Sequence, residues 1–264
     1  MCFYKGMSEV TDRNREYWEI LAAHRYGERL EAFRDGAEIV SREELAAMGD
    51  VAGKQILQVA SSVGDESLAL AMRGAHPTAV DIAPTHVQTG RSKAVELGVQ
   101  VDYRVGDMTA LIKELRDFDV IYISWGGLCW IPDLSSWVSD MADRLVPGGR
   151  LVIAEHHPLW EVLSVVGLDR LAVTASYFDQ RWQGPRDLGK EPSVVRAERL
   201  ETPVHTSFVW NIGQVVTAMI QAGLSITTLQ ESANDAMYPG LEPSRHLPAT
   251  YIAAGERPLR ALLH

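Results

Sequence analysis

The sequence of 264 residues is poor in cysteine, in basic clusters and in long apolar runs. Its two cysteines, Cys2 and Cys129, lie far apart without CxxC or cysteine–histidine spacing, which disfavours a disulfide framework and a structural zinc site. No apolar run reaches the roughly 18 residues of a membrane span, and the polar start lacks the apolar core of a signal peptide. We therefore expect a cytoplasmic chain with no metal and no membrane partner.

Positive charge is also scarce, because 25 Lys and Arg stand against 35 Asp and Glu, which gives a formal net charge of −10. Phosphate backbones repel such a surface unless one face is locally basic, and no cluster of Lys and Arg occurs. This balance disfavours nucleic acid as a partner.

Short apolar runs alternate regularly with helical stretches from Gly53 onward, and a chain of this length most naturally forms one α/β domain. Such alternation requires right-handed crossovers and a mainly parallel sheet covered by helices on both faces. The predicted strands are 56–59, 78–80, 101–105, 119–124, 150–154, 225–231 and 250–254. The predicted helices are 65–73, 84–97, 134–145 and 213–222, and residues 147–149 are predicted to form a turn.

Two segments lie outside this alternation. Helical spacing predicts a helix over 14–33, and the capping box of Ser41 and Glu44 predicts another over 41–48, so residues 1–50 would form a helical cap. Residues 156–209 form an insertion with weak periodicity, and so long a stretch within a compact domain is usually functional. We expect a domain over 51–264 that carries this insertion as a lid.

Ligands of an open α/β sheet bind beyond the carboxyl ends of its strands. The first such end is a loop that contains Ala60, Ser61, Ser62 and Gly64, whose small side chains allow the backbone to approach a ligand closely. The alternative is an ordinary connection between a strand and a helix.

Three further strand ends carry polar or small residues. The carboxylate of Asp81, followed by Ile82, can accept both hydroxyl protons of a ribose. Asp107 can receive the amino group of an adenine, and Met108 would offer its backbone N–H and an apolar flank. Ser124 ends the fourth strand, where small residues leave room for a ligand. Both aspartates would also suit a helix cap or a turn.

Four pieces of sequence carry a family resemblance, namely Val80-Asp81-Ile82, Val105-Gly106-Asp107-Met108, residues 119–124 and Leu145-Val146-Pro147-Gly148-Gly149-Arg150-Leu151. Their pattern resembles the class I S-adenosylmethionine-dependent methyltransferases, over about 53–155 and the last two strands. The resemblance implies a Rossmann-like, seven-stranded, mainly parallel sheet with a reversed last strand, and S-adenosyl-L-methionine as cofactor. His157-Pro158 and the segment 130–134 look like a bacterial small-molecule branch that includes antibiotic-tailoring, lincosamide N-methyltransferases.

The first loop departs from the family pattern of an acid followed by three alternating glycines. Gln58 replaces the acid, and Ala60 and Ser62 replace two glycines. Because only positive φ strongly requires glycine, alanine and serine at these positions still allow the backbone to approach a ligand closely if their φ stays negative.

The resemblance implies methyl transfer to an N or O atom of a small, secondary-metabolite acceptor, for which the protein mainly supplies alignment. Tyr17 and Trp18 on the first helix would close over the cofactor, or would instead pack on the sheet. His156 and His157 follow the fifth strand and are candidates for a general base, although His157 could simply shape a turn. His205 in the insertion is a further candidate.

Tryptophans gather at or after the end of the fourth strand. Aromatic surface there would suit a flat, apolar or cationic small molecule, although core packing explains some of these side chains. The predicted substrate site consists of Trp125, Trp130, His157, Trp160, Trp182 and His205.

Other functions fit parts of the pattern. A nicotinamide-dependent oxidoreductase has similar strand-to-acid spacing but needs a glycine-rich pyrophosphate loop, which 58–64 supplies poorly. The glycine-poor loop also suits a non-catalytic S-adenosylmethionine-binding protein, and the same cofactor serves C-methylation and non-methylating reactions. Pairing of two copies through the aromatic-rich insertion stays open.

Overall fold

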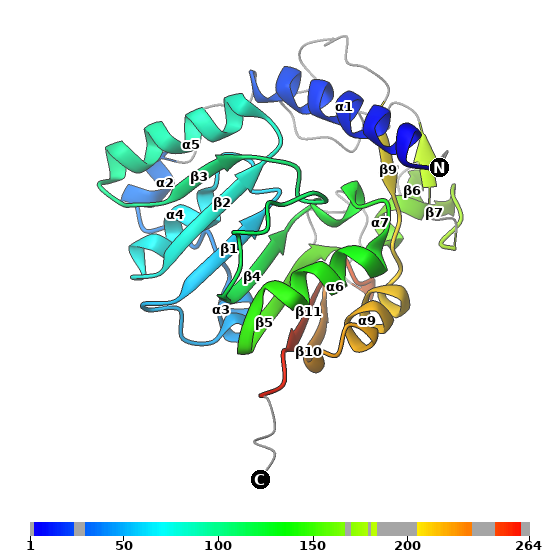
Figure 1. Ribbon diagram of the computed structural model, residues 1–264. Helices are drawn as coiled ribbons and strands as arrows, with labels where there is room; N and C mark the ends of the chain where they lie inside the picture. Colours follow the sequence, from blue (N-terminus) through cyan, green and yellow to red (C-terminus); the bar gives the residue numbers. More distant parts are fainter. Residues whose placement is uncertain are drawn as a thin grey trace.

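The computed structural model describes residues 3–23, 30–166, 170–178, 181–183, 205–233 and 246–259. A seven-stranded sheet runs through it in the order β10-β11-β5-β4-β1-β2-β3 (Figure 1). Its strands are β1 (Gln55–Val59), β2 (His76–Asp81), β3 (Asp102–Val105), β4 (Phe118–Ser124), β5 (Leu145–His156), β10 (Ser225–Ser232) and β11 (Thr250–Glu256). Strands β1 to β5 are parallel, whereas β11 is antiparallel to its neighbours β5 and β10. The predicted Rossmann-like sheet with a reversed last strand is confirmed.

Alternate residues of the central strands enter two separate cores, because successive side chains of a strand point to opposite faces. Leu57 and Ile121 lie in one core, and Ile56 and Val120 lie in the other. This double burial explains why the strands read as continuous apolar runs rather than as an alternating pattern.

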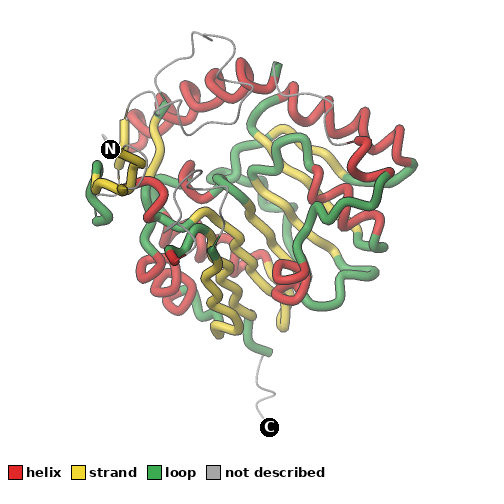
Figure 2. The backbone as a smooth tube through the Cα atoms, turned by 180° about the vertical axis from the view of Figure 1, so that it is seen from behind, coloured by secondary structure: helices red, strands yellow, loops and turns green. Residues whose placement is uncertain are grey.

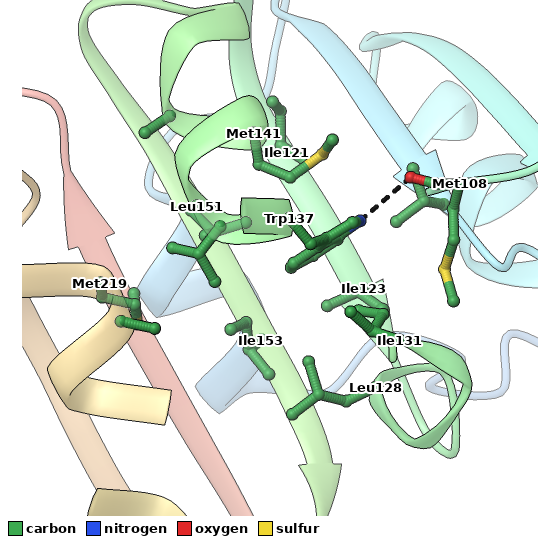
Figure 3. Packing of buried hydrophobic residues seen from close by; sticks show 14 of the residues in the cluster. Met108, Ile121, Ile123, Leu128, Ile131, Trp137, Met141, Leu151, Ile153 and Met219 are labelled. Atoms are coloured by element: carbon green, nitrogen blue, oxygen red, sulfur yellow. Dashed lines mark hydrogen bonds between the residues drawn. The ribbon is translucent and has the colours of Figure 1, made fainter. Parts of the chain in front are cut away.

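Helices cover both faces of the sheet. One face packs against α6 (Leu134–Arg144) and α9 (Ile212–Gln221). Figure 3 shows this core, in which the indole Nε1 of Trp137 donates to the backbone oxygen of Met108 at 3.1 Å. The other face packs against α3 (Arg42–Met48), α4 (Asp65–Met72) and α5 (Pro84–Leu97), and Figure 2 gives the view from that side.

The N-terminal helices differ from the prediction. Helix α1 (Phe3–Ala22) begins earlier than the predicted helix 14–33 and ends well before it, and α2 (Leu30–Arg34) is a separate turn of helix. Figure 1 shows α1 across one end of the sheet. The capping box of α3 is present as predicted, but α3 packs its residues Ala47 and Met48 against the back of the sheet.

The predicted turn at 147–149 is instead part of β5. Because β5 already begins at Leu145, α6 ends at Arg144, one residue before the end of the predicted helix. Gly148 has a φ of 81°, and a Cβ on Gly149 would lie 2.9 Å from the backbone oxygen of Phe118. The two glycines therefore let the strand bend and approach β4 closely, where the register between β4 and β5 shifts.

The described part of the insertion contains short elements. These are α7 (Leu159–Val162), the hairpin of β6 (Leu163–Val166) and β7 (Arg170–Val173), and the ribbon of β8 (Arg181–Gln183) and β9 (Thr206–Phe208). Within the described ranges, no helix combines the length and the apolar character needed to cross a membrane.

Candidate functional site

A cleft lies beyond the carboxyl ends of β1, β2, β3 and β4, and α1 covers it. Most of the predicted cofactor residues line this first cleft, namely Trp18, Ala60, Ser62, Asp81, Ile82, Asp107 and Met108. Trp125 and Trp130, predicted for the substrate, line it too. Sequence reasoning missed the lining residues Asn14 and His86.

The loop after β1 adopts the backbone of a glycine-rich loop without its glycines. Ala60 and Ser62 have φ values of 50° and 51°, so the condition of negative φ, under which alanine and serine would suit this loop without strain, is not met. Hydrogen bonds hold this conformation, because the N–H of Ser61 donates to Val80 O at 3.0 Å and that of Ser62 donates to Asp81 Oδ2 at 2.7 Å. The loop keeps a close backbone approach to the cleft at the expense of left-handed strain.

Asp81 is held rigidly at the centre of this wall. Besides Ser62, its carboxylate accepts the N–H of Ala83 at 2.9 Å and lies 3.1 Å from Nδ1 of His86. It does not cap α5, whose N-cap residue is Ala83. The carboxylate is thus fixed in one orientation on the cleft wall.

His86 lies in the first turn of α5 and is buried in the cleft wall. Its Nδ1 faces Asp81, its ring centroid is 5.9 Å from that of Trp18, and its Nε2 has no partner among the described residues. The sequence could have indicated His86, because it lies in the first turn of the helix that follows Asp81, close to that carboxylate along the chain.

Asp107 forms the turn considered for it and also lies on the wall of the cleft. Its Oδ1 accepts from the backbone N–H and the hydroxyl of Thr109, both at 2.8 Å, which is an Asx turn. Its Oδ2 has no partner within the described chain, and the residue lines the cleft beside Met108.

Two predicted loop residues do not line the cleft. Ser61 is buried beneath the loop. A Cβ on Gly64 would lie 2.6 Å from the ring of Tyr103, so this glycine serves packing rather than ligand approach.

Ser124 also points away from the cleft, into a buried polar network below the loop. Gln58 is fully buried there, where its Oε1 accepts from Ser67 Oγ at 2.5 Å. Its Nε2 donates to Glu66 at 3.2 Å and to Ser124 Oγ at 3.4 Å. The neutral amide at this position satisfies neighbours that a carboxylate would repel or leave unpaired.

Helix α1 is attached at both sides of the cleft. Asn14 donates to Thr206 O at 2.9 Å and accepts from Thr206 N at 3.0 Å, which ties α1 to β9. The carboxylate of Glu19 accepts from the backbone N–H of Thr85 at 3.2 Å and from its hydroxyl, which ties α1 to α5. These contacts hold α1 over the strand ends.

The two aromatic residues predicted on this helix have different surroundings. Trp18 lines the cleft, whereas Tyr17 is buried between Trp130 and His205, with ring centroids 6.0 Å and 4.4 Å away. Tyr17 therefore packs rather than contacts a ligand, and His205 lies buried behind it.

A second cavity adjoins the first and shares Gly126 with it. Glu155, at the end of β5, lines this cavity and is buried. Its carboxylate accepts backbone N–H groups from Gly126 at 2.5 Å, Leu128 at 2.9 Å and His156 at 2.7 Å. Sequence reasoning missed Glu155, although it directly follows the predicted strand 150–154, as Asp81 follows the predicted strand 78–80.

The two histidines after β5 differ sharply. His157 is buried, its Nε2 is 2.9 Å from Glu231 and its Nδ1 accepts from Leu159 N at 3.1 Å. Burial lowers the pKa of His157 below 6.5, although the charge of Glu231 opposes this shift. Both ring nitrogens are engaged and the ring lines neither described cavity, which fits the alternative that His157 shapes a turn; its catalytic and substrate-binding roles stay predictions.

His156 lines the second cavity and remains the candidate base. Its ring is 4.9 Å from that of Trp160 and 5.8 Å from that of Trp125. Trp160 supports His156 but does not line either cavity, and the side chain of Trp182 lies outside the described residues. No group of three or more potential ligand residues suited to a metal occurs in the described part of the chain.

Residues 56–149 match the family model described as a methyltransferase domain. A ubiquinone biosynthesis O-methyltransferase of Xylella fastidiosa is 38% identical over 105 residues, which are 39% of this chain and 42% of that protein. An S-adenosylmethionine-dependent methyltransferase from Mesorhizobium loti superposes with a TM-score of 0.62 and 19% identity, over 81% of this chain and 96% of that one. The fold is that of the S-adenosylmethionine-dependent methyltransferases.

A glycopeptide N-methyltransferase solved with sinefungin shares this fold, with a TM-score of 0.56 and 16% identity over 82% of this chain and 92% of that one. The chain spans less than half the length of the Xylella fastidiosa relative that it matches. The match covers β1 to the start of β5, which is the part of the sheet that forms the first cleft.

Proposed function

We propose that the chain is an S-adenosylmethionine-dependent methyltransferase that methylates an O or N atom of a small molecule. The observation that carries this proposal is the first cleft, where Asp81 at the end of β2 and Asp107 just beyond β3 lie beside a loop with left-handed backbone. The nicotinamide alternative needs a glycine-rich loop around a pyrophosphate, whereas this loop, despite its left-handed backbone, carries side chains at Ala60 and Ser62.

The residues present fit the cofactor. Asp81, which Ser62 and Ala83 hold in place, would accept from the ribose hydroxyls, and Oδ2 of Asp107, which has no partner among the described residues, would accept from the adenine amino group. Ala60 and Ser62 would face the methionine part, and Trp18 would cover the ligand. When bound, this cofactor supplies a methyl group on a sulfonium, which is already a strong electrophile.

The chain itself would supply alignment and a place for the proton of the acceptor. Alignment of two reactants for direct attack is worth roughly 7–11 kcal/mol. His156, at the edge of the second cavity, would take the proton that an O–H or N–H acceptor loses. The curated relative named above, an O-methyltransferase, supports an oxygen acceptor, and the resemblance to antibiotic-tailoring enzymes supports a secondary metabolite.

The domain 51–264, with the 156–209 segment as its lid, would act in the cytoplasm without a nucleic-acid or membrane partner. The Asn14–Thr206 hydrogen bonds support the lid, because they tie the insertion strand β9 to α1 beside the first cleft. A homo-oligomer is compatible with the same arrangement.

Titration of wild type and two variants with S-adenosylhomocysteine tests the cofactor assignment. Asp107→Asn keeps an oxygen for the Asx turn but loses the free acceptor, and Asp81→Ala removes the ribose contact. Each should weaken binding more than about tenfold, or about 1.4 kcal/mol. The matched control is Asp102→Asn, an exposed carboxylate at the start of β3 that lines neither cavity. Unchanged affinity in both site variants would refute the assignment.

A further inference from the structure

The side chains that line the second cavity have a charge and polarity that methyl transfer alone does not explain. Its walls combine an apolar part, to which Phe208 and Trp210 contribute stacked rings 6.3 Å apart, with the polar side chains of Glu155, His156, Glu161 and Tyr251. No lysine or arginine is among the described residues that line it. The cavity lies next to the first cleft, where an acceptor would have to bind.

Glu155 gives this cavity a negative charge. Its three hydrogen-bond donors are backbone N–H groups, which stabilise a carboxylate without neutralising it. Among the described residues, its one ion-pair partner is Nδ1 of His156 at 3.7 Å. Oε1 accepts two of the backbone donors and Oε2 accepts one, so Oε2 keeps a lone pair for a further donor.

Tyr251 provides an independent sign of a ligand. It pairs with Glu155 in the register of β11 and β5, is 1% exposed and lines the cavity, yet its hydroxyl has no hydrogen-bond partner in the described structure. A buried polar group without a partner is costly and calls for an explanation. Burial, followed by the charge of Glu155, raises the pKa of Tyr251 well above its ordinary value, so the group stays a neutral phenol.

We propose that the second cavity binds a positively charged nitrogen of the acceptor, so the substrate class is an amine-bearing small molecule. An ammonium group donates to Glu155 Oε2 and to the Tyr251 hydroxyl oxygen, and the rings of Phe208 and Trp210 attract a cation through their faces. A carboxylate ligand would be repelled by Glu155. The inference rests on the proposed function only where it calls this ligand the methyl acceptor.

Three probes on one phenol scaffold test the charge preference directly. Wild-type protein saturated with S-adenosylhomocysteine is titrated with 4-hydroxyphenethylamine, 4-hydroxyphenethyl alcohol and 4-hydroxyphenylacetate. The amine should bind at least about tenfold more tightly than the alcohol, and the acetate should be weakest. Equal binding of all three, preference for the acetate, or no binding of the amine at millimolar concentration overturns the inference. Failure to bind S-adenosylhomocysteine would instead count against the proposed function.

Two variants locate the effect. Glu155→Gln should reduce the amine preference at least several-fold, and Glu161 would account for what is left of it. Glu256→Gln should leave the preference unchanged, because Glu256 lies at the end of β11 away from Tyr251. Tyr251→Phe should weaken amine binding severalfold and at the same time raise the melting temperature, because it removes an unpartnered buried hydroxyl. If Tyr251 had only a structural role, Tyr251→Phe would not weaken amine binding while it raised the melting temperature. If Glu155→Gln fails to fold, Tyr251→Phe decides, and unchanged amine affinity in it overturns the inference.

Discussion

The positive φ values in the glycine-poor loop after β1 predict that glycine substitutions there relieve backbone strain. Ala60 and Ser62 occupy left-handed backbone, with φ values of 50° and 51°, although neither is a glycine. Replacing each by glycine keeps the hydrogen bonds of the loop, since these come from backbone N–H groups. We therefore expect Ala60→Gly and Ser62→Gly to stabilise the protein.

The magnitude follows from two opposing terms. A left-handed conformation costs a residue with a side chain roughly 1–2 kcal/mol. The extra freedom of glycine in the unfolded chain offsets about 0.5–1 kcal/mol of this. Each substitution should raise the free energy of unfolding by about 0.5–1 kcal/mol, and both together by about 1–2 kcal/mol. Ala60 also loses a methyl group packed at the edge of the core, so its gain is the smaller one.

Urea unfolding followed by circular dichroism measures this effect, and about 1 kcal/mol corresponds to a melting-temperature shift of roughly 2–4 °C. Ser61→Gly is the matched control, because Ser61 lies between the two residues without positive φ and should lose stability. Equal losses in all three variants would show that the left-handed backbone is not strained and would refute the reasoning.

Two further predictions concern buried polar groups. Gln58→Glu should lower the free energy of unfolding by about 1–3 kcal/mol, because it buries a carboxylate beside Glu66 and removes an amide donor; an unchanged urea midpoint would contradict this. The folded-state pKa of His157 is lowered, so the unfolded chain binds its proton more readily. Stability should therefore fall as pH drops below about 6.5, and more steeply in wild type than in His157→Asn. Parallel pH profiles would show that His157 does not titrate in this way.

The sheet could be predicted from the sequence because its strands are buried on both faces and read as apolar runs. Asp81 and Asp107 could be placed because the alternation of strands and helices shows where each strand ends, and ligands bind beyond those ends. The helix 14–33 could not be delimited, because spacing gives the face of a helix more reliably than its ends.

Contacts between segments that are distant in the chain could not be predicted from the sequence. Asn14 meets Thr206 across 192 positions, and nothing in either neighbourhood indicates the pairing. Gly64 and Ser124 fit the loop pattern by type, yet their surroundings turn them toward Tyr103 and Gln58. Residue type fixes what a side chain can do, and only packing decides which way it points.

Calorimetric titration of the wild-type chain with S-adenosylmethionine, with NAD as the comparison ligand, tests the central claim most directly. We expect saturable one-to-one binding of S-adenosylmethionine and none of NAD. No binding of S-adenosylmethionine at hundreds of micromolar, or tighter binding of NAD, would contradict the account.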